Sequence, residues 1–113
     1  MACRSRNSKA LHTFDVDAAS AVETLREMPS PNTLVELYAS WCPHCQRFAK
    51  PLQQVHEALQ PFRDEVGLLA VDCANKTNSE VVCGKFDVKG FPTLLWGNPS
   101  LFATAIETQS VPE

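Results

Sequence analysis

The chain has 113 residues, 44% of them hydrophobic and 20% charged, with a net charge of −3. This length and balance are typical of one ordinary globular domain with a single core. The nearly balanced charge, without a basic run, argues against nucleic-acid binding, and no apolar stretch reaches the roughly 18 residues that a membrane span needs.

We expect a flexible leader over residues 1–9, one domain over residues 10–107 and a short tail over residues 108–113. No apolar h-region follows the first methionine, so a secretory signal is not visible in this chain. The chain is therefore expected to be either a cytosolic protein or a mature secretory domain cut from a longer precursor.

The hydrophobic pattern predicts strands that alternate with helices. In chain order these are strand 10–14, helix 17–28, strand 33–39, helix 43–59, strand 66–72, helix 77–86, a strand that ends at residue 96, and an edge strand over 101–106. Asp17 is expected to cap the first helix, and Thr77 to open the third with a capping box. This order favours an α/β sandwich in which helices flank a mixed sheet, without a clear final helix.

The second helix should pack on the sheet through one apolar stripe. The stripe consists of Phe48, Leu52, Val55 and Leu59. Pro51 lies inside this helix, where it removes a backbone hydrogen bond and should kink the axis.

Cys42, Pro43, His44 and Cys45 join a buried strand to this helix. A two-residue spacer lets the two cysteines close a small disulfide. Pro43 suits the first helical position, which puts Cys42 at the N-cap, where free N–H groups and the helix dipole stabilise a thiolate. We therefore expect Cys42 to be the nucleophile and Cys45 the shielded resolving thiol. His44 could add a hydrogen bond or a positive charge beside the Cys42 sulfur.

Two alternatives to redox chemistry are a zinc site and an inert structural disulfide. A second zinc knuckle would need two ligands a few residues apart, whereas Cys73 and Cys83 are separated by nine residues. We expect no metal. With five cysteines at most two bridges can form; Cys3 is the expected spare, and in an oxidising compartment Cys73 and Cys83 would most simply pair with each other.

Three segments carry a family resemblance that covers roughly residues 10–96. Residues 35–45 (Val-Glu-Leu-Tyr-Ala-Ser-Trp-Cys-Pro-His-Cys) and 90–93 (Gly-Phe-Pro-Thr) resemble the active-site stretch and the proline loop of protein disulfide isomerase and thioredoxin domains. Residues 71–80, followed by Cys83, more closely resemble the thioredoxin domain of the quiescin sulfhydryl oxidases. The chain departs from the family in having Pro43 where glycine is commoner, and Pro51 one residue later than the usual helix proline.

The resemblance implies roles for further residues. Glu36 would accept and return the proton of the buried second cysteine, although a strand-end glutamate could instead reach solvent or a lysine. Phe91 and Pro92, joined by a cis peptide bond, would bring backbone groups beside the disulfide to bind an incoming peptide. Trp41 would form part of the substrate surface. The resemblance also implies a structural disulfide between Cys73 and Cys83.

His12 and His56 are expected to lie at the surface without a functional role.

The resulting hypothesis is a thiol–disulfide oxidoreductase that oxidises dithiols of cysteine-containing proteins and forms the thioredoxin domain of a sulfhydryl oxidase. The alternatives are a stand-alone disulfide isomerase-like domain and a non-catalytic module that binds client proteins. No cofactor is expected in this chain, because it has no Gly-rich dinucleotide fingerprint; FAD would belong to a separate flavin domain. The secretory pathway (endoplasmic reticulum, Golgi or extracellular space) is the expected location, and the triplet Asn75-Lys76-Thr77 is compatible with glycosylation there.

Overall fold

The computed structural model describes residues 11–108. The predicted leader, Cys3 and all but the first residue of the predicted tail lie outside the described residues. In chain order the elements are α2 (Ala18–Glu27), β1 (Asn32–Tyr38), α3 (Pro43–Leu59), η1 (Gln60–Phe62), β2 (Val66–Asp72), α4 (Lys76–Val81), η2 (Cys83–Lys85), β3 (Thr93–Gly97) and α5 (Pro99–Glu107). None of the helices over residues 11–108 is both long and apolar enough to cross a membrane.

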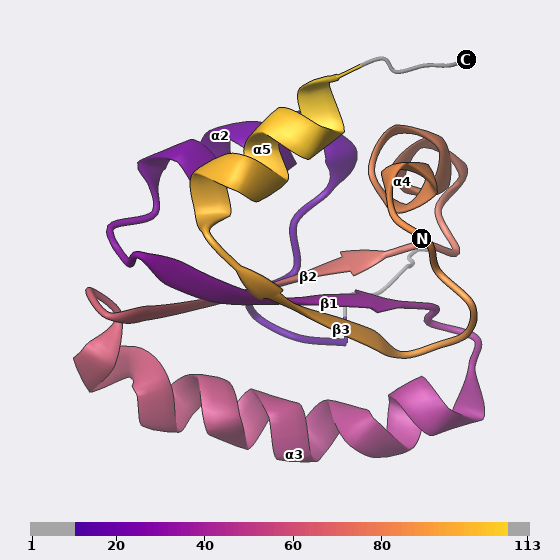
Figure 1. The fold of residues 1–113 in the computed structure, drawn as a ribbon. Helices are drawn as coiled ribbons and strands as arrows, with labels where there is room; N and C mark the ends of the chain where they lie inside the picture. The colour runs from indigo at the N-terminus through magenta and orange to yellow at the C-terminus, as the bar shows by residue number, and fades with distance from the viewer. Residues whose placement is uncertain (1–10, 109–113) are drawn as a thin grey trace, which may run out of the picture.

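The three strands form one mixed sheet in the order β2-β1-β3 (Figure 1). β1 is parallel to β2 and antiparallel to β3, with Glu36 paired to Ala70 on one side and to Leu94 on the other. The parallel pair needs a long crossover connection, which α3 supplies. The predicted α/β fold with a mixed sheet flanked by helices is therefore confirmed.

Helices cover both faces of this sheet: α2, α4 and α5 lie on one side and α3 lies on the other (Figure 1). Successive side chains of β1 point to opposite faces, so Val35 and Leu37 pack toward α2 and α5, while Glu36 and Tyr38 point toward α3. The α2/α5 face has the larger apolar core. Its fully buried members include Ala21, Leu25, Val35, Leu37, Leu69, Val71, Val82 and Ala103.

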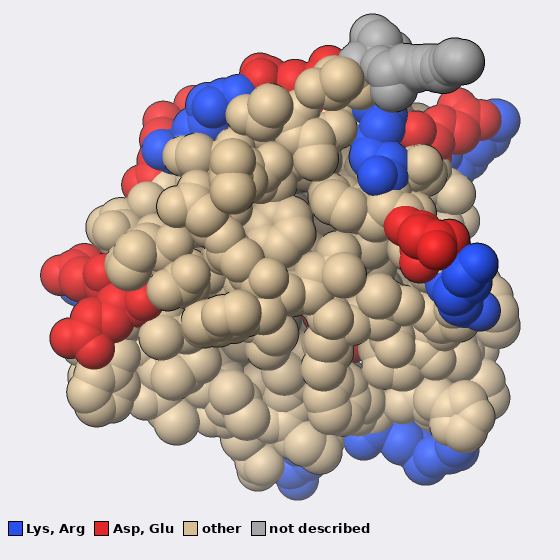
Figure 2. Space-filling model, in the orientation of Figure 1, with Lys and Arg blue, Asp and Glu red and all other residues tan. Residues whose placement is uncertain are grey.

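The front of the molecule, over β3, carries few charges (Figure 2). β3 itself reads Thr-Leu-Leu-Trp-Gly. Positively charged lysine and arginine side chains and negatively charged acidic side chains both lie mainly around the margin of this view. This face therefore presents no continuous surface of one sign that would attract a polyanion.

The segment before α2 does not form the strand predicted over residues 10–14. In its described part, residues 11–14 make a turn, and Asp15 forms a single parallel bridge with Ala70. The Asp15 carboxylate accepts the backbone N–H of His12 at 3.0 Å, which closes the turn. Backbone bonds from Ala70 N to Phe14 O and from Val16 N to Ala70 O then hold the segment along β2.

The last element of the described residues is the helix α5, so the edge strand predicted over residues 101–106 and the absence of a clear final helix are wrong. Asn98 accepts the backbone N–H groups of Ser100 and Leu101 at 2.8 and 3.2 Å, and Pro99 takes the first helical turn. The pair Asn98-Pro99 is thus an N-cap followed by N1.

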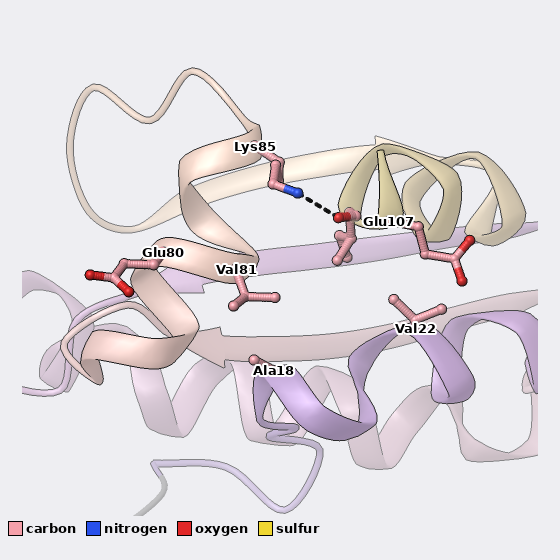
Figure 3. A pocket seen from close by; sticks show the side chains of 7 residues that line it. Ala18, Val22, Glu80, Val81, Lys85 and Glu107 are labelled. Carbon is pink, nitrogen blue, oxygen red and sulfur yellow. Dashed lines mark hydrogen bonds between the residues drawn. The ribbon is translucent and has the colours of Figure 1, made fainter. Parts of the chain in front are cut away.

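Lys85 closes the other end of α5. Its Nζ donates to the carbonyl oxygens of Ile106 at 2.6 Å and Thr108 at 3.0 Å, which the end of a helix leaves without partners. Figure 3 shows Lys85 reaching across a hollow between α2, α4 and α5 that Ala18 and Val22 line. Lys85 therefore has a structural role in this hollow.

Helix boundaries agree with the sequence except at α4. Asp17 caps α2 as predicted and accepts the Ser20 N–H at 3.1 Å. α4 begins at Lys76, one residue earlier than predicted, because Asn75 accepts the Asn78 N–H at 2.9 Å and replaces Thr77 as the cap. It ends at Val81 rather than at residue 86, and the separate turn η2 follows it.

α3 has the predicted bounds and continues through Pro51. Leu52 is buried as the stripe predicts, but Val55 is 43% exposed.

Candidate active site

The junction of β1 and α3 presents the two cysteines. Cys42 is the N-cap of α3 and Pro43 occupies its first turn, as the sequence predicts. The Cys42 N–H donates to Ala39 O at 2.9 Å, and the Cys42 carbonyl accepts the Gln46 N–H at 3.0 Å. The backbone on both sides of Cys42 is therefore fixed, and its sulfur sits over the start of the helix.

Cys42 is arranged to favour its thiolate. Both cysteines of the pair are free thiols in this structure, and 8% of the Cys42 surface is exposed to solvent. The backbone N–H of Cys45 lowers the pKa of the Cys42 thiol most strongly, although burial opposes it; the His44 N–H, the Cys45 thiol and the Arg47 charge act in the same direction as the Cys45 N–H. No side-chain hydrogen bond caps the helix, so these N–H groups act on the sulfur mainly through their dipoles.

The positive charge beside Cys42 belongs to Arg47, which the sequence analysis missed. The His44 side chain is exposed, and its Nδ1 lies 2.9 Å from Arg47 Nη2. His44 itself acts on the Cys42 sulfur through its backbone N–H and not through its side chain. Arg47 could have been found from its place one turn into the helix, three residues after His44.

Cys45 has the opposite environment. It is fully buried, and its sulfur lies 3.5 Å from the Ala39 backbone N–H. Burial raises the pKa of Cys45 to about 11, and the nearby Cys42 and Glu36 charges act in the same direction. The pair therefore combines an outer thiol that ionises readily with an inner thiol that keeps its proton.

Glu36 lies on the central strand, on the side that faces α3, and is fully buried. Its Oε1 lies 2.8 Å from Nε2 of His12, and neither side chain has any exposed surface. Within residues 11–108 the Glu36 carboxyl therefore neither reaches solvent nor meets a lysine.

The prediction of a surface His12 is also wrong. The turn after residue 11 folds its ring against Phe14, at 4.4 Å between ring centroids, and edge-on to Tyr38 at 5.4 Å. His56 is half-buried rather than exposed, with its ring 4.5 Å from that of Phe14.

An apolar surface borders Cys42. Trp41 is 65% exposed and meets Phe91 edge-on, with ring centroids 6.1 Å apart. The Cys42 sulfur lies 4.0 Å from the carbonyl oxygen of Phe91, whose peptide bond to Pro92 is cis. Trp41 and Phe91, which are far apart in the sequence, thus meet beside the reactive sulfur, and Pro92 follows Phe91 directly.

The structure bonds Cys73 to Cys83, with Cα atoms 6.1 Å apart. The bridge ties the end of β2 to η2. It lies beside a hollow that Phe91 also lines.

Within residues 11–108, no group of three or more histidine, cysteine or acidic residues has the arrangement of a metal site.

Comparisons with known proteins agree with this geometry. The thioredoxin family model matches residues 12–110. Sulfhydryl oxidase 1 of Gallus gallus is 38% identical over 98 residues, which are 82% of this chain and 12% of that protein. Sulfhydryl oxidase 1 of Oryza sativa is 38% identical over 104 residues, 80% of this chain and 20% of that protein.

Protein disulfide-isomerase 1 of Dictyostelium discoideum is 36% identical over 65 residues, 58% of this chain and 18% of that protein. The chain thus spans a fifth or less of the length of these curated relatives. Among solved structures, thioredoxin f2 of Chlamydomonas reinhardtii shares the fold with a TM-score of 0.57 at 22% identity, over 77% of this chain and 75% of that one.

Proposed function

The chain belongs to the thioredoxin family and is a thiol–disulfide oxidoreductase domain related to sulfhydryl oxidases, and from this premise we propose that it oxidises dithiols of protein substrates through a Cys42–Cys45 disulfide. The contrast between the two thiols carries the proposal. An outer thiol with a lowered pKa is a good leaving thiolate, and an inner thiol whose pKa is raised to about 11 takes up a proton readily.

The reaction starts from the oxidised pair. A substrate thiolate attacks the Cys42 sulfur and forms a mixed disulfide; the Cys42–Cys45 bond breaks, and its electron pair goes to Cys45, which takes a proton. A second substrate thiolate then attacks the substrate sulfur, forms the substrate disulfide and releases Cys42 as a thiolate. Two electrons pass from the substrate dithiol to the cysteine pair.

Glu36 is the proposed proton donor and acceptor for Cys45. It is fully buried, and its charge acts on the Cys45 thiol. A carboxyl group held out of water can pass a proton to a neighbouring buried thiolate without admitting solvent. Its own position on a central strand keeps it on the side of the sheet that α3 covers.

Substrate would bind where Trp41 and Phe91 border the Cys42 sulfur. The exposed indole offers an apolar contact to residues beside the substrate cysteine. The Phe91 carbonyl, 4.0 Å from the sulfur, could accept a backbone N–H of an extended peptide. Pro92 follows directly and would shape the same surface.

The relatives named sulfhydryl oxidases support a finer proposal, that the chain is the thioredoxin domain of such an oxidase. The electrons would then leave Cys42 and Cys45 for a flavin in a separate domain. The Cys73–Cys83 disulfide supports an oxidising compartment of the secretory pathway.

A single-turnover measurement tests the proposal. The oxidised chain, mixed with excess dithiothreitol, should show one rapid change in Trp41 fluorescence and oxidise about one equivalent of dithiol. An oxygen electrode should record almost no consumption, because the acceptor lies outside this chain. Sustained oxygen-dependent turnover by the 113 residues would contradict the proposal.

The rival function, a module that only holds clients, predicts a different result for Cys42→Ser. We expect this variant to lose dithiol exchange and the oxidation of a reduced protein substrate while it keeps client binding, whereas for a pure binding module the wild type itself would leave a reduced protein substrate unoxidised. Recovery of activity from scrambled RNase, whose disulfides are already formed but mispaired, would identify a disulfide isomerase, since isomerisation needs no external electron acceptor.

A further inference from the structure

Glu36 has no charged neighbour within the sheet that holds it. Its cross-strand partners are Ala70 on β2 and Leu94 on β3. A fully buried carboxylate between apolar neighbours is unfavourable, because it has lost its hydration and gains no partner in exchange. A partner for its charge must therefore come from outside the sheet.

That partner is His12, which comes from the turn before α2. Its Nε2 lies 2.8 Å from Glu36 Oε1, at hydrogen-bond distance, although the two groups are not aligned as a hydrogen bond. The bridge between Asp15 and Ala70 anchors the turn beside Glu36's own strand partner. Stacking of the ring on Phe14 and its edge contact with Tyr38 limit how far the imidazole can turn away.

We propose that His12 is a positioning residue for proton transfer at Glu36: its imidazole holds the carboxyl toward Cys45 and stabilises the buried carboxylate that remains when the proton has moved to Cys45. The inference rests on the proposed function and adds a residue to its machinery. Imidazole suits the task because a ring nitrogen can either donate a hydrogen bond to a carboxylate or accept one from a carboxyl group.

The charge movement explains why a partner is needed. When Cys45 leaves Cys42 as a thiolate, it takes the Glu36 proton, so one negative charge passes from sulfur to carboxylate with no change in the total. The reverse transfer accompanies attack by Cys45 on a mixed disulfide at Cys42. In both directions the charge on Glu36 lies against Nε2 of His12 rather than against apolar side chains alone.

Other titratable groups face this pair, but they have different partners. Asp15 accepts the His12 backbone N–H at 3.0 Å and the Tyr38 hydroxyl at 2.8 Å, and burial raises its pKa. Burial also raises the pKa of Tyr38, which therefore stays neutral. From α3, Cys45 and His56 lie close enough that, in addition to burial, the Glu36 charge raises the pKa of Cys45 and His12 lowers the pKa of His56. Burial lowers the pKa of His56, so it carries little charge near neutral pH.

The test separates the two cysteines in one experiment. Protein carrying Cys3→Ser, so that the spare thiol releases no thionitrobenzoate, and with Cys42 and Cys45 reduced is mixed with excess 5,5′-dithiobis(2-nitrobenzoic acid) in a stopped-flow instrument. Cys42 attacks first and releases one thionitrobenzoate; Cys45 then attacks the mixed disulfide and releases the second. The first phase reports Cys42 alone, and the second needs the Cys45 proton to be removed.

We expect Glu36→Gln to slow the second phase by about 100-fold, the size of general acid–base assistance, and His12→Gln to slow it by about tenfold. The first phase should stay within about twofold in both. In His12→Gln the rate of the second phase should also reach half its maximum only at a higher pH, because the Glu36 carboxylate has lost the imidazole that lies against it. His56→Gln is the matched control, because His56 packs against the same Phe14 ring but is not paired with Glu36, and it should behave as wild type.

A double variant tells positioning from mere packing. If His12 acts through Glu36, His12→Gln added to Glu36→Gln causes no further slowing of the second phase. A second phase in His12→Gln with the rate and pH profile of His56→Gln overturns the inference, as does full additivity in the double variant. If His12→Gln does not fold, His12→Asn is judged by the same criteria. Failure of dithiol exchange in the wild type would instead overturn the proposed function.

Discussion

The two faces of the sheet differ in what they bury. The α2/α5 face packs Leu25, Leu37 and Val71 among other apolar side chains, each at most 1% exposed. The α3 face buries both cysteines of the pair and, beside them, His12 and Glu36. Among residues 11–108, neither Glu36 oxygen has a well-aligned protein hydrogen bond. Because unsatisfied buried polar atoms cost stability, the comparison indicates that one face stabilises the fold and the other serves chemistry.

The largest expected contrast lies within the α3 face, between the two thiols. At about neutral pH, iodoacetamide should label Cys42 about a hundredfold or more faster than Cys45, because the pKa of Cys42 is lowered and that of Cys45 is raised to about 11. Mass spectrometry of the reduced, partly labelled chain measures both rates. Faster labelling of Cys45 would reverse the assignment of the two roles.

The same two pKa shifts, at Cys42 and Cys45, make the stability of the reduced protein depend on pH. The raised pKa of Cys45 contributes stability that is fully present below the unfolded value near 8.5 and is lost as the pH rises toward about 11. The lowered pKa of Cys42 contributes stability above the unfolded value, and this is lost as the pH falls through the folded one. Reduced Cys42→Ser, which isolates the Cys45 effect, should therefore unfold at lower urea concentration at pH 10 than at pH 8, while reduced Cys42→Ser/Cys45→Ser shows a smaller change.

On the apolar face, Leu25→Ala should reduce the free energy of unfolding by about 3 kcal/mol, through lost burial and a residual cavity. Leu25 is 1% exposed and lies in the α2/α5 core. Urea unfolding followed by circular dichroism measures the loss. Both phases of the thiol reaction should keep their wild-type rates; a slowed second phase would show that the two faces cannot be separated in this way.

The disulfide belongs to the same stabilising side, because Cys83 is part of the α2/α5 core. Replacing Cys73 and Cys83 by serine should reduce the free energy of unfolding by up to about 3 kcal/mol, the chain-entropy value for a short loop. The exchange rate of Cys42 should remain unchanged. Peptide mapping without reductant should find these two cysteines linked in the wild type, and two free thiols there would contradict the structure.

The smallest effect is expected at the start of α5. Asn98→Ala removes the oxygen that accepts the Ser100 and Leu101 N–H groups, and should reduce the free energy of unfolding by about 1 kcal/mol. Asn98→Asp keeps an accepting oxygen and is the matched control. An unchanged midpoint in Asn98→Ala would mean that packing alone holds α5 on α2.

Strong local patterns were enough to predict the elements that carry the cysteines. Helix α3 and strand β2 have the predicted bounds, because α3 has an apolar stripe at helical spacing and β2 is a short, continuous apolar run. The two failures have weaker local signals. Residues 101–106 are apolar and suit either a strand or a helix, and the cap at Asn98 decided between them. The segment before α2 was too short for periodicity to distinguish a strand from a turn with one bridge.

The same difference between local and distant signals applies to the residues of the site. The order strand, Cys42, Pro43 and Cys45 is local, so helix-terminus chemistry could be inferred from neighbouring residues in the sequence alone. The contact between His12 and Glu36 is not local. It exists because a side-chain bond closes the turn at Asp15 and a bridge to Ala70 lays that turn against the α3 side of the sheet. Which partner a buried charge meets depends on how distant segments pack, and composition and spacing carry no record of that choice.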